Sequence, residues 1–456
     1  MNHPTRRAAL ALCIVSLCGI TASAGPLTPP PGPVAPTPGP EPRKVVNATN
    51  TPAAGFDLYR ITEPGSYYLN ANINITGPFW GIAIEAPGVT LDLNGFTITG
   101  AGLGIPTGGI RVTQPGAVIR NGTIRNVFFG GIASDSPTTG SPGAIIEQVR
   151  VLDVTGPGGP GGGASGSGAG IFAGRGAIVR DCYVSNAPTG IAAGFHSNVS
   201  GCTVEFARQF GIKVEGGANV SGCVVAGTAG GPADGHAFVL GVGSSVKDCV
   251  ARTNTGAGFV DLGDTAFADC RSTNNGGAGF IAANNSSFEG CHAVSNGGAG
   301  FVGEINFRLE VCHAARNNGP GVEISSASDW EISRCSFIRN FGGGVIASGV
   351  ALRGRIQDCS IRGDSVVVPD SIGIKVPKGC EDIIITNCAF SQFSVAVELD
   401  GRFSRVTSNA FNFFNTAEPV LKADGSVPDS SNIIGPYVLS FSAGTATNPF
   451  ANTLQR

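Results

Sequence analysis

The stretch that decides the fold is residues 249–280, CVARTNTGAGFVDLGDTAFADCRSTNNGGAGF. Three features recur in it at an interval of 21 residues: Cys249 and Cys270, Asn254 and Asn275, and Phe259 and Phe280. A fixed interval of this length is typical of stacked supersecondary units. We therefore expect a repetitive fold that extends over a long part of the chain.

The same repeat continues on both sides of this stretch. Ten cysteines share the register of Cys249 and Cys270. The residue three positions before each of these ten is Val, Leu, Ile or Phe, and Ile or Phe stands eleven positions before seven of them. We interpret both sets as columns of side chains that point into the protein. The ten cysteines that share this register, which we call the ladder cysteines, are Cys182, Cys202, Cys223, Cys249, Cys270, Cys291, Cys312, Cys335, Cys359 and Cys388.

Between five of these cysteines and the next apolar column, the chain has the pattern Asn-x-Gly-x-Gly, which begins at Asn254, Asn275, Asn296, Asn317 and Asn340. Asn and Gly tolerate left-handed backbone conformations, so the pattern predicts a turn between two short strands. A unit of strands and turns without helical periodicity closes one coil of a solenoid. The sequence predicts an all-β parallel β-helix of about 14 coils, roughly 65 Å long at about 4.8 Å per coil. Terminal caps are expected at 56–74 and 411–456, and a glycine-rich excursion at 156–168.

With these motifs over residues 67–412, the chain resembles the right-handed parallel β-helix repeat proteins, a superfamily that includes pectate lyases, polygalacturonases and alginate epimerases. The resemblance implies a right-handed coil. It carries over no catalytic residue, because the chain lacks the Asn-Thr-Asp, Asp-Asp and Gly-His-Gly signatures of polygalacturonases. The Asp-Pro-His of alginate epimerases and the Arg-x-Pro-x-x-Arg of many pectate lyases are absent too.

The first 24 residues have the pattern of a signal peptide. Arg6 and Arg7 precede an apolar run over residues 8–20, and Ala22-Ser23-Ala24 suits a signal peptidase. The run is too short for a membrane anchor, so we expect no membrane span in the mature chain. Residues 25–44 contain nine prolines and predict an extended linker. Residues 45–456 are expected to form one β-helix domain that is exported to the periplasm, the cell surface or the medium.

The charge of the mature chain argues against a nucleic-acid partner. The whole chain has 29 basic and 32 acidic residues, and removal of Arg6 and Arg7 leaves 27 against 32, a formal charge of −5. Nucleic-acid-binding proteins usually carry a basic surface. A polysaccharide is the partner that we expect from the fold class, and the sequence says nothing about the oligomeric state.

The ladder cysteines are expected to be buried free thiols. Side chains stacked one coil apart lie beyond the Cβ separation of about 3.5 to 4.5 Å that a disulfide needs. An inward column also offers no open tetrahedral metal site. Cys380 is out of register, eight residues before Cys388, and a local disulfide between these two is the alternative.

Successive coils are predicted to stack five titratable side chains on the outside of the solenoid. His292 and His313 each follow a ladder cysteine, and Arg271 has the same place one coil earlier. Glu289 and Glu310 stand two positions before the cysteines of successive coils. Arg271, Glu289, His292, Glu310 and His313 are therefore the candidate catalytic residues, and a solvated ladder of balanced charges is the structural alternative.

This group suits chemistry on sugars. Paired carboxylates are the catalytic groups of glycoside hydrolases, and carboxylates beside arginines suit uronate chemistry assisted by calcium. Calcium is the metal that this chemistry implies, and no nucleotide or redox cofactor is indicated. The function favoured is binding or processing of an extracellular polysaccharide by lyase or hydrolase chemistry, and the alternative is a non-catalytic surface or structural module.

A second outward surface follows the glycine turns. Lys213, Glu215, Glu304, Glu323 and Lys375 alternate there with Val239, Val260, Ile281, Val302 and Ile346. A column of apolar side chains is unusual on a solvated face. It indicates either a stripe on which sugars stack or a contact between subunits.

Overall fold

The structure is a computed structural model that describes residues 43–102, 105–134, 143–156, 168–231, 235–325, 327–364, 371–412, 420–421, 430–435, 437–439 and 452–455. The chain divides into two compact units, Met1–Pro42 and Arg43–Arg456. The first unit holds the predicted signal peptide and most of the predicted linker, and these lie outside the described residues. The second unit is all-β in its described residues, with every pairing between named strands parallel.

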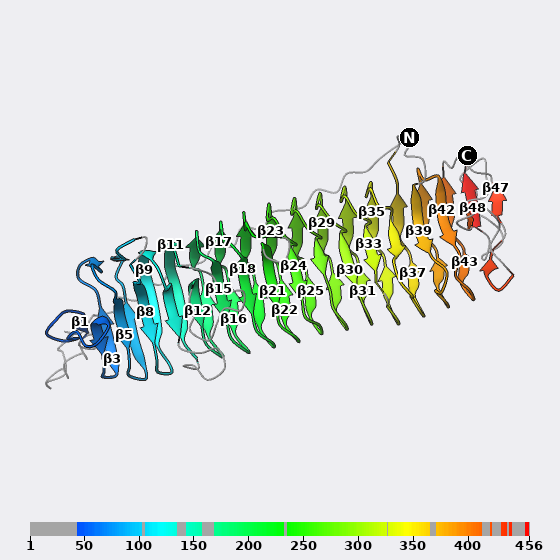
Figure 1. Cartoon of the computed structure of the whole chain (residues 1–456). Coiled ribbons are helices and arrows are strands. Elements are labelled where there is room, and N and C mark those ends of the chain that lie inside the picture. Colours follow the sequence, from blue (N-terminus) through cyan, green and yellow to red (C-terminus); the bar gives the residue numbers. More distant parts are fainter. Residues whose placement is uncertain are drawn as a thin grey trace, which may run out of the picture. The chain divides into compact units, whose positions relative to one another are not determined.

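Successive coils of the second unit follow one another in chain order (Figure 1). Each coil contributes one strand to a 16-stranded sheet. The strands of this sheet are β2 (Asp57–Ile61), β5 (Trp80–Ile84), β8 (Gly108–Val112), β10 (Gly130–Ser134), β12 (Ala169–Ala173), β15 (Thr189–Ala193), β18 (Phe210–Val214), β21 (His236–Leu240), β24 (Phe259–Asp261), β27 (Phe280–Ile281), β30 (Phe301–Gly303), β33 (Val322–Ile324), β36 (Val345–Ala347), β39 (Ile372–Val376), β42 (Val395–Leu399) and β45 (Val420–Leu421).

The other 32 strands form a second sheet that bends around a corner in each coil. The strands on the first side of the corner are β3 (Gly65–Tyr68), β6 (Val89–Asp92), β13 (Ile178–Arg180), β16 (Asn198–Ser200), β19 (Asn219–Ser221), β22 (Ser245–Lys247), β25 (Ala266–Ala268), β28 (Ser287–Glu289), β31 (Arg308–Glu310), β34 (Glu331–Ser333), β37 (Arg355–Gln357), β40 (Ile384–Thr386), β43 (Arg405–Thr407) and β46 (Ile433–Ile434).

The strands on the second side are β4 (Ile73–Asn74), β7 (Thr97–Thr99), β14 (Tyr183–Ser185), β17 (Thr203–Glu205), β20 (Val224–Ala226), β23 (Val250–Arg252), β26 (Arg271–Thr273), β29 (His292–Val294), β32 (His313–Ala315), β35 (Ser336–Ile338), β38 (Ser360–Arg362), β41 (Ala389–Ser391), β44 (Ala410–Asn412) and β48 (Asn452–Gln455). The longer strands β9 (Val118–Val127) and β11 (Ile145–Val154) pass through the corner, and β1 (Lys44–Val45) and β47 (Tyr437–Leu439) complete the sheet.

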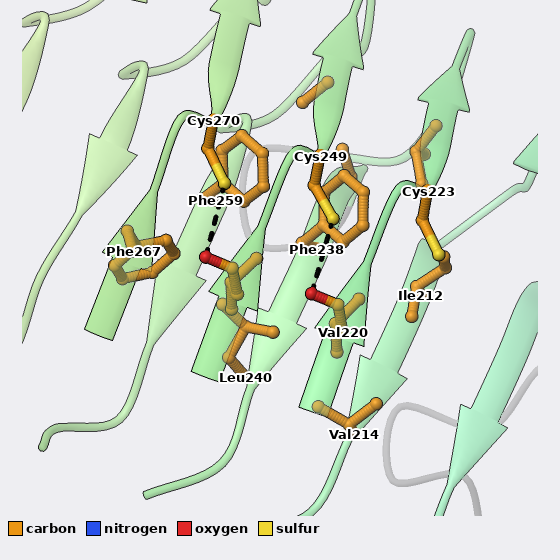
Figure 2. Close-up of a cluster of buried hydrophobic side chains, with 14 of the residues drawn as sticks. Ile212, Val214, Val220, Cys223, Phe238, Leu240, Cys249, Phe259, Phe267 and Cys270 are labelled. Atoms are coloured by element: carbon orange, nitrogen blue, oxygen red, sulfur yellow. Dashed lines mark hydrogen bonds between the residues drawn. The ribbon is translucent and has the colours of Figure 1, made fainter. Parts of the chain in front are cut away.

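The apolar columns predicted from the sequence form the core. Phe238, Phe259, Phe280 and Phe301 are register partners in the 16-stranded sheet, and their rings stack 4.6 to 4.9 Å apart within 7° of parallel. Figure 2 shows Phe238 and Phe259 beside the ladder cysteines. All four rings are fully buried. The fold class is therefore confirmed, with about 15 turns against the 14 predicted.

Every cysteine in the described residues is a buried free thiol. The Sγ atoms of Cys249 and Cys270 donate to the carbonyl oxygens of Val220 and Val246, at 3.7 and 3.6 Å (Figure 2). Cys380 is free too, so the alternative of a Cys380–Cys388 disulfide is not realised.

A column of buried asparagines starts the glycine turns. Asn254, Asn275, Asn296 and Asn317 each donate from Nδ2 to the Oδ1 of the asparagine in the next coil, at 2.8 to 3.1 Å, and the last acceptor is Asn340. The same Oδ1 atoms accept backbone N–H groups, as in the 3.1 Å bond from Asn275 to Asn296. Hydrogen bonding of this kind removes the cost of burying amides.

The segment expected as the N-terminal cap is instead a regular coil. β2, β3 and β4 lie within 56–74, and they pair in parallel with β5, β6 and β7. The prediction of a cap there was wrong because Tyr67 and Ile73 fill inward positions, although the 21-residue pattern is weak in this part of the sequence. At the other end, β44 pairs in parallel with β48. Residues 157–167 of the predicted glycine-rich excursion lie outside the described residues.

Each coil turns the corner of the larger sheet through a residue with left-handed backbone. Gly201, Gly222 and Gly290 stand directly before ladder cysteines with φ of 60 to 63°. Val311 occupies this place before Cys312 with φ of 54°, which is strained for a β-branched residue. The hydrogen bond from its N–H to the carbonyl of Ser333, at 3.1 Å, holds the residue in the corner.

Replacing Val311 by Asn should stabilise the protein by about 1 kcal/mol, because Asn tolerates the left-handed region that Val resists. The side chain of Val311 is 51% exposed, so little packing is lost. Urea denaturation followed by circular dichroism measures the change. Val350→Asn, at a position that is 54% exposed and has no positive φ, is the matched control with little expected change. Equal effects of the two variants would contradict strain at Val311.

Candidate functional site

The register places the predicted basic column as expected. Arg271 in β26 is the partner of His292 in β29, which is the partner of His313 in β32. The two imidazole rings are 5.7 Å apart between centroids and tilted by 56°. Arg271 is exposed and both histidines are half-buried.

The predicted pair of carboxylates is also brought into register. Glu289 in β28 is the partner of Glu310 in β31. These strands lie before the corner of the coil, whereas the histidines lie after it, and Gly290 and Val311 make the bend between them. The five predicted residues therefore form two columns on either side of a corner.

A hollow of about 410 Å³ lies on the side of the glutamates. Glu310 lines it, but Glu289, Arg271, His292 and His313 do not. Arg334 forms an ion pair with Glu310 across it, and Gln357 donates from Nε2 to Glu331 Oε1 at 3.3 Å. Its lining consists of Arg308, Leu309, Glu310, Glu331, Ser333, Arg334, Gln357 and Asp358.

The environment of His313 separates it from this hollow. Burial lowers the pKa of His313, and the nearby charges of His292 and Arg316 lower it further. Burial and the positive charge of Arg316 therefore favour a neutral imidazole at His313, which is not arranged as the conjugate acid partner of the glutamates.

The structure also reveals an aromatic platform that the sequence did not indicate. Trp80 in β5 is the register partner of Gly108 in β8. A Cβ atom on Gly108 would lie at nearly equal distances, all under 3.0 Å, from three adjacent atoms of the indole, Cε3, Cζ3 and Cδ2. Nearly equal distances to adjacent ring atoms require the point to lie over the ring face, so the indole lies flat on Gly108. The Phe129 ring is inclined to it by only 17°, with centroids 6.2 Å apart.

Four charged side chains flank this platform on the same sheet. Arg111 donates to Asp57 Oδ2 at 3.0 Å and to Glu85 Oε1 at 3.2 Å. Arg60 forms an ion pair with Glu85. Asp57 is 5% exposed, while the Arg60 side chain is 39% exposed, so the network is anchored in the protein and reaches solvent.

Sequence reasoning missed the platform because it looked for repeated residues. Trp80 occurs once, and its place is taken by Gly108 and Gly130 in the next two coils. The signal that could have revealed it was one of only two tryptophans of the chain, at the start of a strand whose successors begin with glycine.

Asp261 is a second missed residue, at an inward position of β24. It is 3% exposed, and Oδ1 accepts hydrogen bonds from the Gly263 N–H at 2.6 Å and the Ser286 hydroxyl at 3.1 Å. Oδ2 has no hydrogen-bond partner in the described part of the chain. Burial raises the pKa of Asp261 to about 6.

Among the described residues, no three His, Cys, Asp or Glu side chains gather in a group that could hold a metal ion. The involvement of calcium stays a prediction. The same part of the chain also contains no helix long and apolar enough to cross a membrane.

The fold and these sites define a parallel β-helix protein with polar and aromatic surface sites. Residues 201–351 match the family model described as a right handed beta helix region. A search of curated protein sequences finds no match.

Solved structures that are similar to this chain include two epimerases and a glucanase. The A-module of the mannuronan C-5 epimerase AlgE4 from Azotobacter vinelandii is 16% identical, with a TM-score of 0.45, over 75% of this chain and 91% of that one. The periplasmic alginate epimerase AlgG is 13% identical, with a TM-score of 0.43, over 69% and 80% of the two chains. The catalytic domain of a GH87 alpha-1,3-glucanase is 12% identical, with a TM-score of 0.36, over 86% and 63%. These scores are too low to assign any property of those proteins to this chain.

The Asp261 carboxyl should make the protein less stable as the pH rises from about 4 to about 7. Its folded pKa of about 6 lies above the ordinary pKa of 3.8, so its stabilising contribution is complete below pH 3.8 and is lost as the pH rises through 6. The loss is about 3 kcal/mol at most. Asp261→Asn should remove this component, and the difference between the two unfolding free energies at a series of pH values from about 4 to about 7 measures it. Parallel pH profiles of parent and variant would contradict the assignment.

Proposed function

We propose that the protein binds an extracellular polysaccharide on the outer face of the 16-stranded sheet, with a sugar ring stacked on Trp80. The observation that carries the proposal is the indole lying flat on Gly108. The apolar faces of sugar rings stack on aromatic side chains, and a flat-lying indole offers its second face to a ligand.

The neighbouring side chains suit the hydroxyl groups of a sugar. Asp57 and Glu85 accept hydrogen bonds, and the Arg60 and Arg111 guanidinium groups donate them in a fixed plane. The ion pairs among these four residues balance two negative and two positive charges. The platform therefore favours a neutral sugar unit.

The N-terminal sequence supports the extracellular part of the proposal. A basic start, a short apolar run and Ala22-Ser23-Ala24 are what an exported chain needs. Polysaccharides of cell walls, biofilms and surfaces are then within reach of the platform.

Trp80→Ala should lower the affinity for the bound polysaccharide about tenfold, because the stacked face is lost. Gel electrophoresis with a panel of neutral and uronate polysaccharides in the gel identifies the ligand and measures the change. Phe195→Ala, at an exposed aromatic residue of another coil, is the matched control and should bind as the parent does.

Intrinsic fluorescence gives a second measurement. Trp330, the other tryptophan, is buried, so a ligand should change the emission of Trp80 only. The change should disappear in Trp80→Phe. Absence of binding to every polysaccharide in the panel would refute the proposal.

We propose as a second function that the hollow beside Glu310 processes a uronate-containing polysaccharide. Arg308 and Arg334 line the hollow together with Glu310 and Glu331, so it combines groups that neutralise a uronate carboxylate with groups that transfer protons. Glu289, in register with Glu310, extends the carboxylate column by one coil. The basic column of Arg271 and the two histidines would then contact the polymer beyond the corner.

A double variant, Glu289→Gln and Glu310→Gln, should lower turnover at least about 100-fold, the usual contribution of a general acid or base. New reducing ends report hydrolysis, and absorbance of unsaturated uronates reports a lyase. Lys247→Gln, an exposed change on another coil of the same sheet, is the control. Unchanged turnover in the folded double variant would move the catalytic site away from this column.

A further inference from the structure

One column of outward-facing residues on the 16-stranded sheet is apolar over four successive coils. Register pairing connects these residues in an unbroken row. We call this row the central stripe, and its members in chain order are Lys213, Val239, Val260, Ile281, Val302 and Glu323. All six side chains are partly exposed.

Small side chains border the central stripe on one side, where Ala257 and Ala299 are buried and Ala278 is partly exposed. On the other side stand Leu262 and Ala283, between Glu215 and the exposed Glu304. Leu262 is 62% exposed. A contiguous row of exposed apolar groups on a soluble protein usually marks a contact with another molecule.

The two ends of the central stripe carry opposite charges. Lys213 stands at one end, with its Nζ 5.5 Å from the centre of the Phe210 ring, and Glu323 stands at the other. Neither forms an ion pair with another residue in the described ranges. The next charged residues of the column, Lys375 and Glu398, pair with each other at 2.7 Å.

We propose that the central stripe binds a second copy of this chain across a two-fold axis. The axis lies in the interface, parallel to the strands, between the rows of Val260 and Ile281. It reverses the order of the coils and maps the stripe onto itself. Lys213 then faces the partner's Glu323, Val239 faces the partner's Val302, and Val260 faces the partner's Ile281.

The neighbouring columns obey the same symmetry. Leu262 faces the partner's Ala283, so a large side chain meets a small one. Such self-complementarity is what an isologous interface requires. Each ion pair occurs twice, once at each end of the apolar stripe.

The charges also fix the register of the two copies. Sliding one copy by a single coil would place Lys213 against the partner's Val302 and leave both charges of each copy against apolar groups. An unpaired charge at an apolar contact is costly, so this alternative is disfavoured. The symmetric arrangement is the one in which every charge at the ends of the stripe is paired.

The dimer goes beyond polysaccharide binding and does not depend on it. The axis lies between the ninth and tenth of the sixteen strands, β24 and β27. The first two strands, β2 and β5, therefore extend beyond the partner's last strand. Asp57 in β2 stays accessible, and the Trp80 ring, which lies over Gly108 in β8, stands at the edge of the area that the partner covers.

Charge reversal at the two ends of the central stripe tests the proposal. Sedimentation equilibrium of the full chain without polysaccharide should show a dimer. Lys213→Glu and Glu323→Lys should each weaken it at least about tenfold, because like charges then meet at both ends. The double variant Lys213→Glu and Glu323→Lys should regain the parent affinity, since both pairs are restored with reversed signs.

Mixing the two single variants gives the sharpest result. The stripe of Lys213→Glu is acidic at both ends, and the stripe of Glu323→Lys is basic at both ends. In a mixed dimer, each acidic end of one chain faces a basic end of the other, so the two weak self-associators should form a one-to-one dimer.

Two further variants complete the test. Lys247→Glu, on the other sheet, is the charge control and should dimerise as the parent does, whereas Val260→Asp, at the centre of the stripe, should abolish association. A monomeric parent, or a dimer indifferent to the charge reversals, would overturn the proposal, whatever the outcome of the polysaccharide experiments.

Discussion

Parallel, in-register pairing between successive coils is the constraint on which the rest of the structure depends. Each residue lies directly beside its counterpart from the coil before, so whatever occupies a position is repeated along a column. Phenylalanines stack on phenylalanines at 4.6 to 4.9 Å because the strand spacing imposes nearly the distance that parallel rings accept. A single register error would move every side chain of a strand to the opposite face.

The same pairing decides which polar groups can be buried. An asparagine amide has both donors and an acceptor, so a column of asparagines satisfies itself from Asn254 to Asn340. Asp261 has acceptors only, and it stands alone among apolar neighbours in its column, Leu240 and Ala282. Its Oδ2 is left without a partner in the described structure, and burial raises its pKa to about 6. Repetition thus supplies the partner of each buried asparagine, whereas Asp261 depends on the Gly263 N–H and the Ser286 hydroxyl for the hydrogen bonds of one oxygen.

The sequence predicted what the repeat makes visible and missed what occurs once. The interval from Cys249 to Cys270 was enough for the fold, the buried thiols and the register of Glu289 with Glu310. It could not show that glycine or Val311 turns the corner between the glutamates and the histidines, because the angle between two faces has no periodic signal. The sequence did not reveal the role of Trp80 for a related reason. The indole lies flat because a glycine stands in the next coil, and that glycine looks like one more turn residue in the sequence.

Function in such a scaffold is therefore to be sought where a column changes its chemistry. The row from Val239 to Val302 is uniform, but it ends in Lys213 and Glu323, and uniformity between two opposite charges is what makes a surface complementary to itself. The column of Trp80 changes its chemistry too. One large side chain is followed there by glycines, which leave room for the ring to lie flat. A regular solenoid has long, flat faces. A few substitutions at the ends of a column are then enough to make such a face bind a partner in one orientation.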